Sequence, residues 1–356
     1  MSEAAQETAP LAAGFPAHWL DRAWAAWAGR SKMFSGGFGN QELLSMIAGP
    51  PLYRPQAALV APAFEEPRSA RGVLVRDGIF PSPVELLPLE SRTAHVRFLT
   101  SSNGGPRRGS AVILAGSRDA GYRLRTGIFG PLVKQGVDLY LLENPYYGLR
   151  RPAAQPAENL ATAADQALLI WGMVEEARGL LGWLWRQRRG AVCVAGYSMG
   201  GFVAGAVGSL CDHPVGVAAL AAGVSPAPVY TRGLLSRQVD WDALGREAGS
   251  PQAARERLHA FFGQGSTARL PLPRTPQAAV ILGCLRDGYV PAAETNALAA
   301  RYPGARVRWV SAGHVSALFT ERAGLRAAVS EALERARAFS QPPEPKRDYL
   351  GMIDGR

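Results

Sequence analysis

The sequence is poor in lysine. Of its 39 basic residues only Lys32, Lys134 and Lys346 are lysines, so arginine carries nearly all of a formal net charge of +10. The arginines are scattered along the chain and no nucleic-acid-binding motif accompanies them, so we expect no nucleic-acid partner. A general preference for arginine over lysine explains the pattern, and a surface that binds anions is the alternative.

Cysteine is also scarce. Cys193, Cys211 and Cys284 cannot form a fully paired disulfide framework, and none has the CxxC spacing of a metal or redox site. Each lies in an apolar stretch, where a free cysteine behaves as a small core residue. The N-terminus lacks the basic and apolar regions of a secretory signal. These features predict a protein of a reducing, cytoplasmic compartment.

Charge is absent from one long run, residues 191–211, which is long enough to span a bilayer. Its first five residues are nevertheless typical of a β-strand, and a glycine-rich turn follows them. We therefore predict a buried strand, a turn and a helix instead of a membrane span.

Apolar strands alternate with helices through most of the chain. Continuous apolar strands of this kind are typical of a parallel sheet covered on both faces. Two extended segments, 73–76 and 95–99, are joined by the proline-rich residues 80–88 and predict an antiparallel start. The later strands are predicted at 111–114, 137–142, 191–195, 215–221, 278–284 and 306–310, and the helices at 122–135, 157–188, 199–211, 291–301 and 323–339.

The predicted organisation is one elaborated domain with terminal appendages. Residues 1–60 form an N-terminal helical extension and linker, 61–340 the α/β domain, and 341–356 a mobile C-terminal tail. Within the domain, residues 224–276 interrupt the strand pattern with a mostly helical stretch of mixed charge. We expect this insertion to form a small helical lid.

A short helix is predicted at residues 16–32, with Trp19, Trp24 and Trp27 near helical spacing. We expect these tryptophans to dock on the core of the domain. The alternative is peripheral contact with a membrane, because basic residues accompany the tryptophans and the two together suit a lipid interface.

The segment Gly196-Tyr197-Ser198-Met199-Gly200 has the pattern G-x-S-x-G of a nucleophile elbow. The pattern is a weak signal alone, but here a strand precedes it and a helix follows, as the elbow requires. Glycines two residues either side of the serine relieve the crowding of a tight turn. The context predicts an α/β-hydrolase fold, a mostly parallel central sheet flanked by helices, with Ser198 as nucleophile. A plain glycine-rich turn is the alternative.

A serine hydroxyl needs a base to take its proton. In this fold the acid and then the histidine follow the serine, each on a loop after a later strand. His314 follows the strand at 306–310 among small residues that let the imidazole reach the elbow, so we predict it to be the base. The remaining histidines precede the serine, lie too near it, or fall in the insertion: His18, His95, His213 and His259.

The acid is expected after the preceding strand, where Asp287 lies 27 residues before His314. That spacing accommodates one helix and one strand. A carboxylate there would hold the imidazole in the correct tautomer and stabilise the imidazolium. Asp240 and Asp242, in the insertion, are the competing candidates.

Two backbone N–H groups are expected to receive the oxyanion of a tetrahedral intermediate. Met199, directly after the serine, supplies the first. The second is assigned by position to Ser117, on the loop after the first parallel strand, with Gly116 or Arg118 as alternatives. Arg118 and Asp119 could instead form an ion pair, or Arg118 could contact an anionic group of a substrate.

With these residues placed, the chain resembles the α/β-hydrolase domain-containing protein 18 family from about residue 34 to about 335. The most specific segments are Asn-Pro-Tyr-Tyr-Gly at 144–148 and Gly-His-Val-Ser-Ala at 313–317. The resemblance implies a serine hydrolase that needs no metal or organic cofactor, and it supports Ser198, Asp287 and His314. The chain departs from the expected pattern at Ser117-Arg118, where a smaller loop residue is expected.

The leading hypothesis is therefore hydrolysis of a carboxylic ester, with lipid esters among the candidate substrates, through an acyl-Ser198 intermediate. Acyl transfer to an alcohol or amine would use the same acyl-enzyme. A non-catalytic binding protein built on the same fold is the third hypothesis, and the complete set of triad residues argues against it.

Overall fold

One mixed sheet forms the centre of the computed structural model, which describes residues 16–48, 52–70, 72–187 and 190–340. Its strands are β1 (Ala63–Phe64), β2 (Arg68–Ala70), β3 (Val73–Pro81), β4 (Thr93–Ser101), β5 (Gly109–Leu114), β6 (Val137–Leu142), β7 (Ala191–Tyr197), β8 (Gly216–Leu220), β9 (Ala279–Cys284) and β10 (Arg306–Val310). Within the described residues their order is β1-β3-β4-β6-β5-β7-β8-β9-β10, and β2 also pairs with β3. The strands from β6 to β10 in this order run parallel, whereas β4 pairs antiparallel with both β3 and β6. The predicted antiparallel start and mostly parallel sheet are confirmed.

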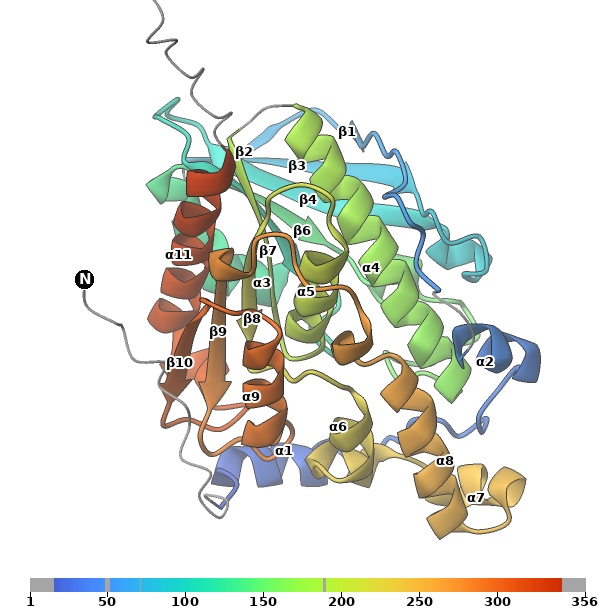
Figure 1. The fold of residues 1–356 in the computed structure, drawn as a ribbon. Helices are drawn as coiled ribbons and strands as arrows, with labels where there is room; N and C mark the ends of the chain where they lie inside the picture. The colour runs from blue at the N-terminus through green and yellow to red at the C-terminus, as the bar shows by residue number, and fades with distance from the viewer. Residues whose placement is uncertain (1–15, 49–51, 71, 188–189, 341–356) are drawn as a thin grey trace, which may run out of the picture.

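Helices cover both faces of the sheet (Figure 1). They are α1 (Trp19–Ala28), α2 (Gln41–Ala48), α3 (Arg123–Phe129), α4 (Ala163–Arg186), α5 (Met199–Leu210), α6 (Ala227–Thr231), α7 (Trp241–Ala248), α8 (Pro251–Gln264), α9 (Ala292–Ala300), α10 (Ala317–Thr320) and α11 (Arg322–Ser340). Side chains alternate between the faces of a strand, so Val112 and Leu114 pack with α4, α5 and α9, and Ala111 and Ile113 pack with α3 and α11. The sheet is thus buried on both sides, as its apolar strands predict.

Two predicted helices differ in extent from the observed ones for local reasons. The helix predicted at 157–188 begins only at Ala163, because Thr162 and Asp165 close a capping box that fixes its first turn. The helix predicted at 122–135 becomes α3 followed by the 3-10 turn Gly130–Gln135. Pro131 near the start of that turn lacks the N–H that would continue the α-helical hydrogen bonds.

The insertion at 224–276 is helical, as predicted, and contains α6, α7 and α8. The apolar side of the insertion packs against the segment that precedes α2. Phe34 and Phe38 of this segment share a hydrophobic cluster with Tyr230, Leu258 and Phe262 of the insertion. Figure 1 shows α7 and α8 at one end of the molecule, where α8 contacts α2. The predicted C-terminal tail at 341–356 and the first fifteen residues lie outside the described part of the chain.

The N-terminal helix is present, but the expectation that its tryptophans dock on the core is wrong. Trp19, Trp24 and Trp27 are 66%, 43% and 58% exposed, respectively. The helix packs inward through its other face, on which Asp21 and Ala25 are fully buried. The periodicity marks an amphipathic helix correctly, but here small residues and a carboxylate face the protein while the aromatic rings face outward.

Among the helices that the structure describes, none is long and apolar enough to cross a membrane. The uncharged run at 191–211 forms β7, a tight turn and α5, as predicted. All three cysteines are free, with Cys193 and Cys284 buried and Cys211 partly so.

A buried ion pair joins α4 to the loop that follows β6. The guanidinium of Arg150 donates to both carboxylate oxygens of Glu176, at 2.5 and 2.7 Å, and neither side chain is exposed. Arg150 also donates to the Glu143 carbonyl at 2.7 Å, and the Ser82 hydroxyl donates to Glu176 at 2.6 Å. Since both charges are desolvated, each depends on the other for compensation.

We predict that Glu176→Ala lowers the free energy of unfolding by about 3–5 kcal/mol, because the Arg150 charge is left buried without a counterion. Urea denaturation measures the loss. Glu158→Ala is the matched control, since Glu158 pairs with Arg151 at 3.4 Å at the surface, where a pair contributes at most about 1 kcal/mol. Equal losses in the two variants would contradict the prediction.

Candidate active site

Ser198 lies in a strained turn between β7 and α5. Its backbone has φ 57° and ψ −120°, a conformation that side-chain-bearing residues rarely adopt. The turn is so tight that a Cβ on Gly196 would lie 2.3 Å from the carbonyl carbon of Gly200. A Cβ on Gly200 would in turn lie 2.8 Å from the Leu114 carbonyl oxygen on β5. Both glycines of the motif are therefore required by close packing, as predicted.

The structure brings the three predicted residues into one hydrogen-bonded line. The Ser198 Oγ lies 2.8 Å from His314 Nε2, and His314 Nδ1 lies 2.7 Å from Asp287 Oδ2. The other carboxylate oxygen of Asp287 accepts the N–H groups of Tyr289 and Val290, each at 2.8 Å. That second contact fixes the carboxylate and leaves Oδ2 directed at the imidazole.

His314 lies in a closed, aromatic environment. The rings of Tyr197 and Tyr289 have centroids 5.3 and 5.1 Å from the imidazole, and the Tyr197 hydroxyl donates to the His314 carbonyl at 2.5 Å. Burial by itself lowers the pKa of His314, but the negative charge and hydrogen bond of Asp287, together with the charge of Asp21, outweigh it. The pKa of His314 is consequently raised above its usual value of 6.5.

The competing aspartates lie at the start of α7, with Asp242 in its first turn. Asp240 caps α7 by accepting the Ala243 N–H at 2.9 Å. The other histidines also have their own roles or places: His18 caps α1, His213 stacks on Trp185, His259 contacts the Thr231 hydroxyl, and His95 lies on β4.

Ser117 and Met199, the two residues predicted to supply N–H groups for an oxyanion, line one small cavity with Ser198. The Arg118 N–H, an alternative donor, instead donates to the Tyr147 hydroxyl at 3.3 Å. The suggested ion pair of Arg118 with Asp119 is wrong, because the Arg118 guanidinium donates to Asn159 at 2.5 Å. Asp119 pairs with Arg125 at 2.9 Å instead.

The loop after β6 supports the loop that contains Ser117, a role that the sequence motif does not indicate. Besides the Tyr147 contact, the Asn144 side-chain amide lies 3.5 Å from the carbonyls of Ala115 and Gly116. These residues belong to the Asn-Pro-Tyr-Tyr-Gly segment. The segment is specific to the family that the sequence resembles, but the sequence alone does not indicate what it does. The contacts hold the first-strand loop beside the elbow.

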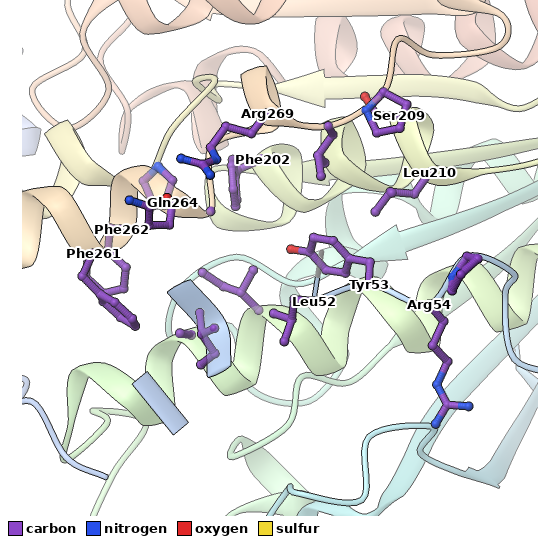
Figure 2. Close-up of a pocket in the computed structure, with 18 residues that line it drawn as sticks. Leu52, Tyr53, Arg54, Phe202, Ser209, Leu210, Phe261, Phe262, Gln264 and Arg269 are labelled. Carbon is purple, nitrogen blue, oxygen red and sulfur yellow. The ribbon is translucent and has the colours of Figure 1, made fainter. Parts of the chain in front are cut away.

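A large apolar cavity adjoins the small one. The cavity beside Ser198 measures about 40 Å³ and the larger one about 770 Å³, and Ile170, Phe202 and Pro226 line both. Figure 2 shows Leu52 and Tyr53 on one side of the larger cavity and Phe202 and Leu210 of α5 on another. Residues of α2, α4 and α8 also line it, together with Arg54 and Arg269. The elbow thus lies beside a larger and mainly apolar cavity, whose lining includes residues of the insertion.

Within the described residues, no group of three or more His, Cys, Asp or Glu side chains is arranged to hold a metal ion. Besides Ser198, the polar residues that line the small cavity are Ser117, Ser225 and Tyr230.

Comparison with known proteins identifies the family. The family described as "Alpha/beta hydrolase domain containing 18" matches residues 32–263 and 249–335, which together span most of the chain. The chain belongs to this family. The resemblance drawn from the sequence segments is therefore confirmed, and α1 lies before the first matched residue.

Solved structures of esterases share the fold of this protein. The acetyl xylan esterase from Paenibacillus sp. R4 is 14% identical, with a TM-score of 0.52, and the alignment covers 85% of this chain and 98% of that one. Acetyl xylan esterase 1 from Thermoanaerobacterium sp. JW/SL YS485 is 12% identical, with a TM-score of 0.52 and coverage of 90% and 99%. At such identities the likeness establishes the α/β-hydrolase fold.

Proposed function

We propose that this protein is a serine esterase that cleaves a carboxylic ester through an acyl-Ser198 intermediate. The observation that carries the proposal is the continuous line of hydrogen bonds from Ser198 through His314 to Asp287, at 2.8 and 2.7 Å. Distances of this length suit proton transfer between a nucleophile and a base that a third group orients.

In the proposed reaction, His314 Nε2 takes the hydroxyl proton as Ser198 Oγ bonds to the ester carbonyl carbon. The carbonyl oxygen becomes an oxyanion, which the N–H groups of Met199 and Ser117 stabilise. The intermediate then breaks its bond to the alcohol oxygen, which leaves with the proton from His314. Water, deprotonated by His314, then attacks the acyl carbon. The bond from this carbon to Ser198 Oγ breaks, His314 returns the proton to the serine oxygen, and the acid is released. Asp287 holds the imidazole and stabilises its charged form throughout.

The adjoining cavity indicates which part of the substrate is apolar. Its volume is about 770 Å³, most of its lining side chains are apolar, and Ile170 and Phe202 also line the cavity at Ser198. An acyl chain attached to Ser198 would gain about 0.8 kcal/mol for each CH₂ that it buries there. We therefore propose an ester with a long apolar acyl chain, such as a lipid ester, as the substrate.

Ser198→Ala tests the nucleophile. We expect the variant to lose covalent labelling by a fluorophosphonate probe and to lose ester hydrolysis, because no other group at the elbow replaces the Oγ. Ser110→Ala is the control, since Ser110 is also buried but lies near the start of β5, at the opposite end of the sheet from the elbow.

Retention of labelling in Ser198→Ala would refute the assignment. Loss of labelling in both variants would indicate unfolding, which circular dichroism detects. Analysis of the products with and without an added alcohol then separates hydrolysis from acyl transfer, which would use the same acyl-enzyme.

Leu210→Trp tests the acyl-chain assignment. Leu210 lines the large cavity but not the small one, so a larger side chain there shortens the compartment without touching Ser198. If about two CH₂ groups are displaced, kcat/KM for a 16-carbon acyl ester falls by about tenfold. Hydrolysis of an acetyl ester with the same leaving group is the internal control and should change little. Parallel losses for both esters would contradict the assignment.

The outward face of α1 supports a further proposal, that the enzyme contacts an anionic membrane surface. Trp19, Trp24 and Trp27 are exposed there, and Arg22 and Lys32 are exposed nearby. Indole rings favour the membrane–water interface, and basic side chains favour anionic headgroups. The position of this helix beside the His314 loop would place the active site close to lipid.

Replacing all three tryptophans with serine should weaken binding to vesicles of phosphatidylcholine and phosphatidylglycerol by about tenfold or more, because the apolar contribution is lost. Vesicle sedimentation measures it. Leu59→Ser, at another exposed apolar residue away from α1, is the control. Unchanged sedimentation of the triple variant would overturn the membrane proposal without affecting the esterase proposal.

A further inference from the structure

Asp21 is a fully buried carboxylate that accepts three backbone hydrogen bonds. On α1, its Oδ2 accepts the N–H of Gly288 at 2.9 Å and that of His314 at 2.8 Å. Its Oδ1 accepts the N–H of Val315 at 2.8 Å. A carboxylate removed from water must have its lone pairs satisfied, and here backbone N–H groups of two separate loops do this.

Those two loops carry the acid and the base of the proposed triad. Gly288 follows Asp287 directly, on the loop after β9, and His314 and Val315 belong to the loop after β10. The N–H groups after Asp287 are divided, with Gly288 donating to Asp21 while Tyr289 donates to Asp287 itself. One side chain from α1 thus connects the backbones beside both residues that orient the serine.

The helix lies against these loops with no spare room. A Cβ on Gly313 would lie 2.3 Å from the His18 Cβ and 2.8 Å from Asp21 Oδ1. A Cβ on Gly288 would lie 3.0 Å from the Ala17 Cβ. The His18 N–H also donates to the Arg286 carbonyl at 3.0 Å, one residue before Asp287. The start of α1 is therefore fitted to both loops by backbone as well as side-chain contacts.

We propose that Asp21 is a positioning residue for the triad, which holds the Asp287 loop and the His314 loop in register so that Asp287, His314 and Ser198 stay aligned. This inference rests on the proposed esterase function. It lies outside the family match, which begins at residue 32. Asp21 touches neither the serine nor the substrate cavities, so it acts through the backbones that it binds.

The charge of Asp21 provides a measurable signature. The groups that face His314 are Asp287 and Tyr289 from the loop after β9, Tyr197 and Ser198 from the elbow, and Asp21 from α1. Nearby negative charge favours the imidazolium, and Asp21 contributes to the raised pKa of His314. Removal of this charge should therefore move the pKa of His314 downward, and with it the acid limb of the rate profile.

Asp21→Asn is the informative variant because its size is unchanged. Its single carbonyl oxygen can still accept the N–H groups of Gly288 and His314, but its NH₂ group then faces the Val315 N–H without an acceptor. We expect kcat to fall by about tenfold to a hundredfold, because a small displacement of catalytic groups slows the chemical step. KM should be nearly unchanged. Reaction with the fluorophosphonate should slow in parallel.

Asp138→Asn is the matched control for loss of a buried carboxylate. Asp138 is buried near the start of β6, where it accepts the Thr100 hydroxyl at 2.5 Å, at the end of the sheet opposite the triad loops. This variant should lower the melting temperature while kcat and the acid limb stay as in the wild type. A purely structural role for Asp21 would give the same pattern in Asp21→Asn.

The experiment compares the full-length wild type and both variants for kcat, KM and pH profile with a chromogenic ester. Histidine NMR titration follows the pKa of His314, which His314→Gln assigns. A lower kcat and a lower pKa of His314 in Asp21→Asn alone would support the proposal. Wild-type kcat and an unchanged pKa of His314 in that variant would overturn it.

Failure of the esterase proposal gives a different result. A wild type that is inert toward esters and the fluorophosphonate would refute the enzymatic function. The NMR titration would still show whether Asp21 controls the environment of His314, because it requires no turnover. An equal pKa of His314 in Asp21→Asn and in the wild type would overturn the positioning role, whatever the outcome for the esterase proposal.

Discussion

Parallel pairing of β7, β8, β9 and β10 is the constraint on which the site depends. Strands that run in one direction end at one edge of the sheet, so the loops after β7, β9 and β10 meet there. Ser198, Asp287 and His314 come from those three loops, and the serine and the histidine are 116 residues apart in the chain. Burial of both faces of the sheet fixes the strand ends. It thereby fixes the distances between side chains that no local interaction could bring together.

The strained turn at Ser198 and the polar contacts around it are stabilised by their surroundings. A φ of 57° on a non-glycine residue is unfavourable by itself and persists because the neighbouring glycines let β5, β7 and α5 pack closely. Around the turn, Asp21, Asn144 and Tyr147 bind loop backbones that the sheet alone would leave without support. Such buried polar groups favour one arrangement, because any other leaves donors or acceptors unpaired.

The predictions that held depended on local pattern and on order along the chain. Apolar strands and the glycines of the elbow are visible without coordinates. So is the chain order of the serine, aspartate and histidine candidates, which the structure places within hydrogen-bonding distance. The predictions that failed concerned which neighbour a side chain meets. Arg118 adjoins Asp119 in sequence but contacts Asn159, and the tryptophans of α1 face outward. In both cases the outcome depended on packing between segments that lie far apart in the chain.

The sequence by itself determined the alternation of strands and helices, the tight turn at Gly196 and Gly200, and the candidates Ser198, Asp287 and His314. These follow from hydrophobic periodicity and from steric demands that act within a few residues. Only the tertiary structure decided the placement of Asp21 beside His314, the support of the Ser117 loop by Tyr147, and the apolar compartment at Phe202. Those features arise where segments far apart in the chain meet. Their geometry is set by the packing of the whole sheet and its helices, which no short stretch of sequence encodes.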